Sequence, residues 1–558
     1  MNETALTAEQ KKRLAERQAR ENRELTPEEV LRRNSVERIK NGKPPATLAG
    51  EFSRLASTPS VAVAEEDILL LQWHGLYHDK PKAGSFMMRI KVPNGILKSA
   101  QLRTVGELAV RHGNNQVEIT TRQDLQIHGI RLETMQEAFA TLQRAGLSTR
   151  AGCGDTLRNI TGCPVAGLDA EELFDTTPLV LEAHRRFSGN PQYDNLPRKH
   201  KWTISACPYH CNAPEIHDVA LVGTMQDGQS GFAVWVGGGM SSAPRLARNL
   251  GVFVTPAESL DVAQALLDEW MGDLRYRTTR SKARFKFMVD DLGPQVLRAR
   301  VEQRLARRLT DLRENPRPEG RTDHLGIHQQ AESNLYYVGF PVLAGILNGE
   351  QLIKIAEIVE GCCDDVRLTR QQNLIVTGVP SCGVNEVVEV LEQEAGLSLK
   401  TNFLRGHSLA CTGHPHCNFS VGETKRKLIE LVEHLEQQFG PAAGDLHLHL
   451  DGCPHACCQH WVGDIGIQGT TLTTPAGKIQ AYDLFLRGGL GTEAQIGKAL
   501  FRRVPTDDLK FYVERLVRAY FSERQNGEPI QGYFARHNDE ELGAIARGSS
   551  ATAAPATT

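Results

Sequence analysis

The sequence has no long apolar run, and it has few cysteines for its length. No stretch reaches the roughly 18 apolar residues that cross a bilayer, and the Glu-, Lys- and Arg-rich segment Met1–Lys40 contains no apolar core of a secretory signal. Twelve cysteines among 558 residues are too few for a disulfide scaffold. These absences predict a cytoplasmic protein in a reducing compartment, without a membrane partner.

The chain also lacks a charge excess and a nucleotide fingerprint. Its formal net charge of −3 gives no overall attraction to nucleic acid, so any anion must be bound by local basic clusters. The triplet Gly237-Gly238-Gly239 does not follow the G-x-G-x-x-G pattern, which argues against a nicotinamide or flavin site. With 40% hydrophobic and 23% charged residues, the composition is that of a globular protein with several cores.

Two cysteine pairs stand on Gly- and Pro-containing loops near the C-terminus. Cys411 and Cys417 form a C-x5-C pair, and Cys453 and Cys457 form a C-x3-C pair. Soft thiolate ligands suit iron and zinc, but zinc ribbons usually have tighter knuckles than C-x5-C. The spacing therefore predicts an iron–sulfur cluster, with a structural zinc site as the alternative. Because a thiolate can bridge two metal ions, Cys457 is a candidate for a ligand shared with a second metal.

An internal repeat organises the rest of the chain. Phe86–Leu102 matches Tyr336–Leu352, and Val117–Ile130 matches Val366–Val379. Within each copy the pattern is strand, helix, two strands, helix, which is the composition of a small α+β sandwich. The sequence predicts an internally duplicated α+β protein in which each half is a small α+β module followed by a larger α/β module. The halves should pack about a pseudo-twofold axis, with a site at their junction.

The two halves differ in their polar residues. Arg89 of the first half aligns with Gly339 of the second, and Arg122 aligns with Gln371. The first half therefore keeps the cations, whereas the second keeps the cysteine quartet. This division predicts that one half holds an anionic ligand and the other holds the redox centre.

Cys207 and Cys211 repeat the C-x3-C spacing at the position that aligns with Cys453–Cys457. The first half has no C-x5-C pair to complete a quartet, because Cys153 and Cys163 are too far apart. A metal-ligand role is therefore the less favoured interpretation of Cys207 and Cys211. Cys458, next to Cys457, is interpreted as a buried small hydrophobe.

A basic pocket is indicated by Lys199 and Lys201, which stand two residues apart at the entry to an apolar, strand-like segment. Period two places both ammonium groups on one face. Together with Arg89 and Arg158 they would form a pocket for an oxyanion, although solvated edge charges are the alternative. His128 alone is a weak signal, more typical of a satisfied core residue than of a ligand.

These motifs, in this order, resemble the siroheme-dependent nitrite and sulfite reductases, in particular their ferredoxin-dependent branch. The resemblance covers about Leu69 to His537. It is carried by Phe86-Met87-Met88-Arg89, Thr120-Thr121-Arg122-Gln123 with Gln126 and His128, Arg158-Asn159, Leu196-Pro197-Arg198-Lys199, the Gly237 triplet, Ala410-Cys411-Thr412-Gly413 and Gly452-Cys453-Pro454.

The resemblance implies residue roles. It implies a [4Fe-4S] cluster on Cys411, Cys417, Cys453 and Cys457, with Cys457 also the axial ligand of siroheme iron. It implies that the substrate faces Arg89, Arg158, Lys199 and Lys201, and that the macrocycle is held by Arg122, Gln126 and His128. Siroheme is a polycarboxylate, so cations and donors around its rim are physically reasonable.

The implied activity is a stepwise six-electron reduction by a monomeric enzyme, with ferredoxin as a separate electron donor. Sulfite reduction to sulfide is favoured, because Lys201 stands where ferredoxin-dependent nitrite reductases tend to carry Asn. Nitrite reduction to ammonia is the first alternative, and a non-catalytic siroheme or iron–sulfur binding protein is the second. The chain departs from the family at His455, where Asn is usual, and at Cys458, where a small residue is frequent. Tyr77 and Cys153 match positions that are covalently joined in some members.

The predicted domains follow the duplication. They are an N-terminal helical arm (1–65), a first ferredoxin-like half-domain (66–150), a first siroheme-binding α/β domain (151–325), a second ferredoxin-like half-domain (326–400), a second α/β domain carrying the cluster (401–540) and a disordered tail (541–558).

Overall fold

The computed structural model describes residues 25–81, 84–320 and 322–548. The beginning of the predicted helical arm and residues 549–558 of the predicted tail lie outside this part of the chain. The described part of the arm contains α2 (Pro27–Arg33), α3 (Ser35–Gly42), α4 (Phe52–Ser57) and α5 (Glu65–Leu70). Lys40 of α3 anchors the arm, because its Nζ donates to the carbonyl oxygen of Leu196 at 2.9 Å.

The small module of the first half is a five-stranded antiparallel sheet with two helices. Its elements are β1 (Leu76–His78), β2 (Ser85–Ile90), β3 (Ile96–Leu97), α6 (Ser99–His112), β4 (Gln116–Ile119), β5 (Leu125–Arg131) and α7 (Met135–Arg144). The strand order is β1-β2-β5-β4-β13. Every strand and helix predicted for this segment is present, with bounds shifted by a few residues.

The small module of the second half repeats this arrangement. It contains β11 (Gly326–Gln329), β12 (Leu335–Phe340), β13 (Ile346–Asn348), α11 (Gly349–Cys362), β14 (Val366–Leu368), β15 (Leu374–Pro380) and α12 (Val384–Ala395), in the strand order β11-β12-β15-β14-β3. The halves exchange a strand, because β13 pairs with β4 of the first half and β3 pairs with β14 of the second. One continuous hydrophobic core lies under both sheets.

Equivalent side chains make equivalent contacts in the two small modules. Gln101 on α6 donates to the carbonyl oxygen of Ala145 at 3.1 Å, and Gln351 on α11 donates to that of Ala395 at 3.0 Å. Helices α6 and α11 cross closely at Gly106, where a Cβ would lie 2.6 Å from a carbonyl oxygen of the other helix. The predicted internal duplication of an α+β fold is confirmed.

Each small module is followed by a larger α/β module with its own core. The first contains α8 (Thr177–Phe187), β6 (Trp202–Ser205), β7 (Val219–Gln226), β8 (Gln229–Val236), β9 (Arg248–Val254), α9 (Pro256–Gly272), α10 (Phe285–Leu305) and β10 (Thr310–Asp311). The second contains α13 (Leu404–His407), β16 (Leu409–Ala410), α14 (Lys425–Phe439), β17 (Leu448–Asp451), β18 (Ile465–Thr474), β19 (Gly477–Leu486), β20 (Lys498–Pro505), α15 (Leu509–Glu523), α16 (Ile530–Arg536) and α17 (Asp539–Arg547).

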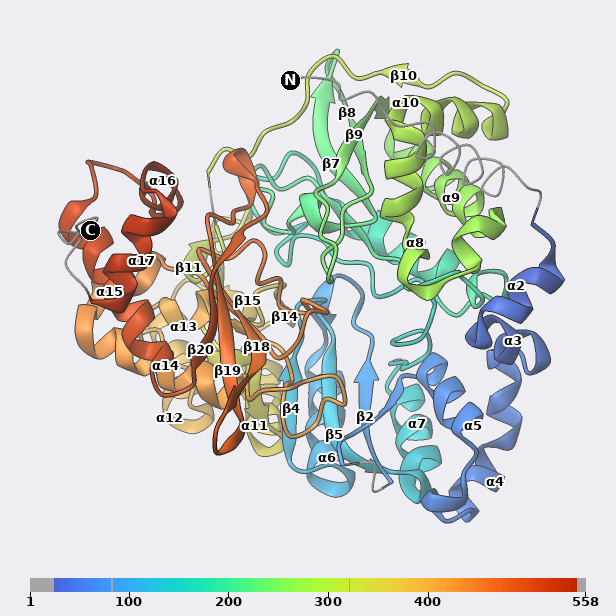
Figure 1. The fold of residues 1–558 in the computed structure, drawn as a ribbon, viewed down its shortest axis with the longest axis horizontal. Helices are drawn as coiled ribbons and strands as arrows, with labels where there is room; N and C mark the ends of the chain where they lie inside the picture. The colour runs from blue at the N-terminus through green and yellow to red at the C-terminus, as the bar shows by residue number, and fades with distance from the viewer. Residues whose placement is uncertain (1–24, 82–83, 321, 549–558) are drawn as a thin grey trace, which may run out of the picture.

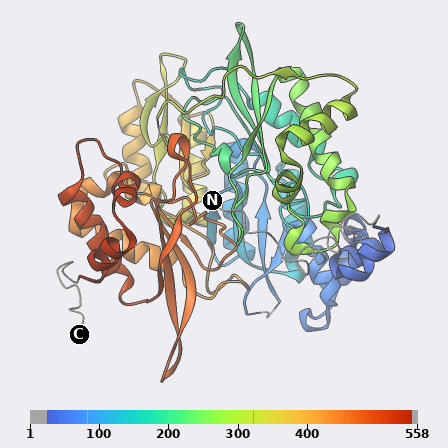
Figure 2. The same cartoon turned by 45° about the horizontal axis from the view of Figure 1, so that its top comes forward.

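The larger modules stand on opposite sides of the molecule. In Figure 1 the first is green, at the upper right, and the second is orange to red, at the left. In the turned view of Figure 2 the first is again on the right and the second on the left. They meet where Trp461 Nε1 donates to the carbonyl oxygen of Ser241 at 2.9 Å. In each module the first long strand, β6 or β17, pairs in parallel with the next strand, β7 or β18.

The prediction of a disordered tail from residue 541 is wrong for residues 541–547, because these residues belong to α17 (Asp539–Arg547). Asn538 caps this helix by accepting hydrogen bonds from the backbone N–H groups of Glu540 and Glu541. The side chains of Leu542 and Ala546 are buried against the second larger module. This short amphipathic helix was not recognised in the sequence, because small and polar residues follow it directly. Among the described residues, no helix is long and apolar enough to cross a membrane.

Candidate functional site

Two arginines of the first half converge on one carbonyl group. Arg89 lies on β2, and Arg158 lies on the connection between α7 and α8. Both guanidinium groups donate to the carbonyl oxygen of Gly152, at 3.3 Å from Arg89 and 3.0 Å from Arg158. Arg158 also donates to the carbonyl oxygen of Gly154 at 2.8 Å. The sequence spacing alone did not establish that the cations of the predicted pocket lie together. The structure brings Arg89 and Arg158 together.

Lys199 and Lys201 are half-buried immediately before β6, which begins at Trp202. In the part of the chain that the structure describes, neither Nζ forms a hydrogen bond or an ion pair. Burial lowers the pKa of Lys199 to about 7 and that of Lys201 well below its usual range, and the Cys457 thiolate opposes both shifts. These two ammonium groups are therefore without a protein counter-ion and are suited to an anionic ligand.

The C-x3-C loop of the second half reaches this cation group. Thr121, in the turn between β4 and β5, donates to the carbonyl oxygen of Cys457 at 3.0 Å. The Cys457 side chain is exposed, whereas Cys453 is buried and Cys411 and Cys417 are intermediate. Cys457 thus stands between the cations of one half and the remaining cysteines of the other.

The sheet of the second larger module explains why the two cysteine pairs meet. Cys411 follows β16 and Cys453 follows β17, and these neighbouring parallel strands end at the same edge. The backbone N–H of Cys411 donates to the carbonyl oxygen of Leu450 at 3.1 Å, and that of Gly452 donates to Cys411 Sγ at 3.2 Å. The second contact is a hydrogen bond of the kind that stabilises a ligating thiolate.

The spacing of the quartet suits a cluster better than a single ion. A tetrahedral zinc site, with Zn–S near 2.3 Å, would hold its sulfur atoms about 3.8 Å apart. Among the described residues, these four cysteines do not form a group whose ligand atoms all lie within 4.8 Å of one another. Four thiols at wider separation, on two loops at one sheet edge, fit the corners of an iron–sulfur cluster.

Gln126 and His128 of β5 link the cation side to the cysteine loops. Gln126 accepts from Arg89 Nε at 3.1 Å and donates to Thr412 Oγ1, beside Cys411, at 3.1 Å. The ring of His128 stacks on that of His416, beside Cys417, with centroids 4.2 Å apart.

His128 is held between two carboxylates, with Nδ1 3.0 Å from Asp79 Oδ1 and Nε2 3.6 Å from Glu118 Oε2. Burial alone would lower its pKa, but these carboxylates outweigh it and raise the pKa to about 9. His128 is therefore a cation at neutral pH. Asp79 and Glu118 carried no recognisable signal in the sequence, because single carboxylates on or near strands are common.

Arg122 lies deeper, between the small and the larger module of the first half. Its Nη2 donates to the carbonyl oxygens of Asn159 and, at 3.0 Å, of Trp202, and its Nη1 lies 2.5 Å from His217 Nε2. The Nε atoms of Arg122 and Arg158 are buried without a hydrogen-bond partner. Unpaired buried donors are costly, and a polycarboxylate macrocycle would satisfy such groups.

Three further sequence predictions concern residues around the quartet. His455 Nδ1 lies 3.6 Å from Cys453 Sγ, so this departure from the family pattern directly borders a proposed ligand. Cys458 is buried, as expected of a small hydrophobe. Burial raises the pKa of Tyr77 to about 12, and Cys153 is the neighbour that adds most to this shift, so the two lie close together. A thioether between Tyr77 and Cys153 stays a prediction.

The first half contains a compact group that the cysteine spacing did not predict. Cys163 forms no C-x5-C pair with Cys153, but the ligand atoms of Cys163, Cys207, Cys211 and His324 all lie within 4.8 Å of one another. Separation along the chain was a poor guide, since adjacent parallel strands bring the loops that follow them together.

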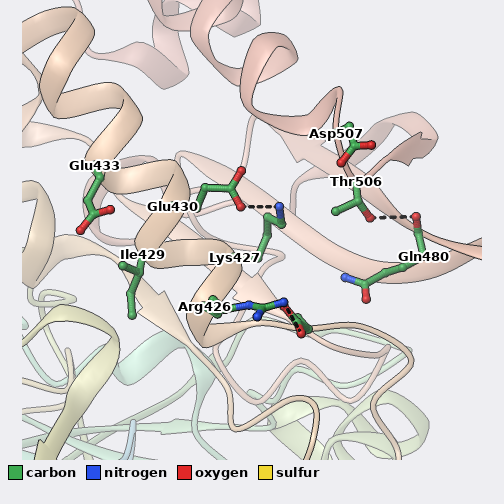
Figure 3. A pocket seen from close by; sticks show the side chains of 9 residues that line it. Arg426, Lys427, Ile429, Glu430, Glu433, Gln480, Thr506 and Asp507 are labelled. Atoms are coloured by element: carbon green, nitrogen blue, oxygen red, sulfur yellow. Dashed lines mark hydrogen bonds and ion pairs between the residues drawn. The ribbon is translucent and has the colours of Figure 1, made fainter.

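A separate hollow on the surface beside α14 lies outside this site. Figure 3 shows Lys427 and Arg426 among its lining residues, each paired with a glutamate. Lys427 Nζ lies 2.5 Å from Glu430, and Arg426 lies 2.8 Å from Glu423. Because its cations are already neutralised, the hollow is not suited to an oxyanion.

Models of known protein families match both small modules and the first larger module. Residues 78–145 and 328–394 match the nitrite/sulfite reductase ferredoxin-like half domain, and residues 153–309 match the nitrite and sulphite reductase 4Fe-4S domain. The two half-domain matches correspond to the two copies of the repeat.

Over most of its length the chain is similar both to proteins named sulfite reductase and to proteins named nitrite reductase. The chain is 35% identical to sulfite reductase [ferredoxin] 1 of Mycolicibacterium paratuberculosis, over 83% of this chain and 84% of that protein. It is 34% identical to the ferredoxin–nitrite reductase of Leptolyngbya laminosa, over 88% of this chain and 98% of that protein. The solved structure of Mycobacterium tuberculosis NirA protein superposes with a TM-score of 0.87 at 29% identity, covering 91% of this chain and 97% of that one.

Proposed function

This chain belongs to the nitrite and sulphite reductase family, and from that premise we propose that it is a ferredoxin-dependent enzyme that reduces sulfite to sulfide in a six-electron reaction. The observation that carries the proposal is the group of cations around Cys457. Arg89 and Arg158 converge on one carbonyl, and Lys199 and Lys201 add two ammonium groups without counter-ions. A protein that only carries electrons has no need of such a pocket.

The chain has residues that fit both cofactors of this family. We propose that Cys411, Cys417, Cys453 and Cys457 hold a [4Fe-4S] cluster, and that Cys457 is shared with the iron of siroheme. Arg122, Gln126 and His128 would hold the macrocycle, with the cationic His128 and the unpaired Nε of Arg122 facing its carboxylates. When bound, these groups supply electrons one at a time to the substrate.

The protein's own residues bind the anion and deliver protons. Arg89 and Arg158 stay charged at every physiological pH, so they position the oxyanion and offset its charge. Lys199 has a pKa near 7, which lets it hold a proton on Nζ and release it to a departing oxygen. Each oxygen leaves as water after taking up two protons. Lys201, next to Lys199, extends this proton supply.

Sulfite is favoured over nitrite because of Lys201. Nitrite has a single negative charge and sulfite has up to two, so an additional cation stabilises sulfite more. The test compares kcat/KM for sulfite and for nitrite with the same chemical electron donor. We expect the larger value with sulfite, and a clear preference for nitrite would instead make the protein a nitrite reductase with an extra lysine.

Replacing Lys201 by Asn should shift this preference. Asn keeps a polar side chain but removes the charge. We therefore expect kcat/KM for sulfite to fall by about 10-fold relative to kcat/KM for nitrite. This factor corresponds to the loss of one charge contact of about 1.4 kcal/mol. Lys478→Asn, an exposed lysine on β19, is the matched control and should leave the ratio unchanged. An unaltered ratio in Lys201→Asn would contradict the charge argument.

The pKa of Lys199 predicts the pH dependence. Protonated Lys199 attracts the anion, and this form is lost as the pH rises through about 7. We therefore expect kcat/KM to fall above pH 7 and to level off below it. Nitrite is the substrate for this profile, because sulfite itself takes up a proton near neutrality. In Lys199→Arg the side chain stays charged, so the falling limb should disappear; a limb that persists there would show that another group titrates.

The remaining proposals concern the setting of the enzyme. We propose that a small ferredoxin docks near Cys457 and delivers the electrons, and that the enzyme is a cytoplasmic monomer. The names of the similar proteins, each specified as ferredoxin-dependent, support the choice of donor.

A further inference from the structure

The first half contains a second cluster of metal-ligating side chains, away from the cysteine quartet. Cys163, Cys207, Cys211 and His324 are all buried, and their ligand atoms all lie within 4.8 Å of one another. Cys163 Sγ is 3.4 Å from His324 Nε2. Three soft thiols and one imidazole at this spacing, on three separate segments of the chain, are the ligand set of a closed structural zinc site.

Strand register shows where this cluster comes from. Thr161 pairs in parallel with Thr203 of β6, and Leu409 pairs in parallel in the same way with β17. Cys163 and Cys411 each stand two residues beyond their pairing residue. Because Cys207 and Cys211 also align with Cys453 and Cys457, three of the four quartet positions have a cysteine counterpart in the first half.

The cluster is therefore the pseudo-twofold equivalent of the redox centre, but two polar residues beside the redox centre have no polar counterpart here. On the facing strands, Ile375 stands where the first half has Gln126, and Gly339 stands where it has Arg89. Ile375 and Tyr337 pack against the three cysteines. The wall formed by Ile375 and Tyr337 lacks the counterparts of Arg89 and Gln126, and the nearby Arg370 donates to the backbone carbonyl oxygen of Cys211 at 3.1 Å. Such a pocket is suited to a small cation neutralised by thiolates more than to a polycarboxylate macrocycle.

His324 can join this cluster because Gly339, on the neighbouring strand, has no side chain. A Cβ on Gly339 would lie 1.9 Å from the carbonyl oxygen of His324, so a side chain at this position would exclude the histidine. The backbone of His324 itself is left-handed, with φ of 54°. A non-glycine residue in this conformation is uncommon and needs compensating contacts.

The ring of His324 is oriented as in a ligating histidine. Its Nδ1 lies 3.3 Å from the hydroxyl of Tyr337 and 3.9 Å from Asp169 Oδ2, while Nε2 points to Cys163. Metal-bound histidines usually give their second ring nitrogen to such an oxygen, which fixes the tautomer. This arrangement leaves Nε2 free to bind an ion.

We propose that Cys163, Cys207, Cys211 and His324 bind one structural Zn²⁺ ion in a tetrahedral Cys3His site. Each thiol releases its proton on binding, and the ion joins the first larger module to the segment that leads into β11 of the second half. The 4.8 Å limit on ligand separation favours a single ion over a second iron–sulfur cluster. The proposal is independent of which oxyanion the enzyme reduces.

The direct test is metal analysis of the holoenzyme as isolated. We expect about one zinc per chain in addition to the iron. Zinc-edge X-ray absorption should show three sulfur ligands near 2.3 Å and one nitrogen near 2.0–2.1 Å. Absence of zinc, iron in its place, or a disulfide among the three cysteines would overturn the proposal. So would a zinc without sulfur ligands, because Asp323, His407 and His447 form a nearby group that offers only nitrogen and oxygen.

A variant links the ion to these residues. Cys207→Ser should lower the zinc content to less than about one tenth while the iron content and the visible spectrum of the holoenzyme stay as they are. Cys382→Ser, at an exposed cysteine after β15, is the matched control and should keep its zinc. If Cys207→Ser keeps its zinc, the assignment is wrong. Should Cys207→Ser fail to accumulate, the absorption spectrum of the unaltered protein still decides.

Discussion

Cys457→Ser is expected to lower kcat/KM for sulfite by more than about 100-fold, a loss larger than that usually seen when a residue supporting a metal ligand is changed. A serine hydroxyl is a hard, weakly acidic ligand and does not replace a thiolate on iron. The loop itself should stay in place, because Thr121 holds it through the carbonyl oxygen of residue 457, not through the side chain. The loss would therefore report on the thiol.

The neighbouring cysteine provides the control. Cys458 is buried, and its Sγ lies 3.9 Å from Gln372 Oε1. Cys458→Ala should keep turnover within a few-fold of the unaltered enzyme. Iron content, the visible spectrum and steady-state turnover of both variants are the measurements. Near-normal turnover of Cys457→Ser would exclude Cys457 as the connection between the two halves of the site.

The second large effect is expected for Arg158→Met, with kcat/KM falling by about 10²–10³. Arg158 is held by the carbonyl oxygens of Gly152 and Gly154, so its charge is positioned before the anion arrives. Methionine fills part of the volume without the charge. The loss should appear with either anion, unlike the effect of Lys201→Asn, because Arg158 stabilises negative charge of any oxyanion.

Arg150→Met controls for removing an arginine from the same segment. Arg150 is paired with Asp194 at 2.6 Å, so its charge is already neutralised away from the pocket. We expect little change in kcat/KM and only a modest loss of stability. If both variants lose activity equally, or if Arg158→Met loses less than about 10-fold, Arg158 has no direct role at the anion.

The repeat was predictable from the sequence because both copies keep the residues that build the fold. Gln101 and Gln351 show this best, since each accepts a hydrogen bond from the backbone N–H at the start of its helix. Each also donates to the equivalent carbonyl oxygen, that of Ala145 in the first half and of Ala395 in the second. The exchange of β3 and β13 between the two sheets was not predictable. Each of these strands is two or three residues long, and a local pattern does not tell which sheet a short strand joins.

Site residues were predictable where the chain pattern carried chemistry, as in the cysteine pairs. They were missed where the fold alone creates the environment. His324 lies in an irregular segment and enters its cluster only because Gly339 on a neighbouring strand has no side chain. His128 resembled an ordinary core histidine, and its positive charge depends on Asp79 and Glu118, which come from two other parts of the chain.

In the proposed enzyme, one half of the duplicated chain supplies the cations and the other supplies the cysteines for a complete six-electron reduction. The most direct measurement is the number of electrons taken from reduced ferredoxin for each sulfide formed, with sulfite as substrate and the intact holoenzyme. We expect six electrons per sulfide, with no partly reduced sulfur product released. Two electrons per turnover, or oxidation of ferredoxin without sulfide, would contradict it.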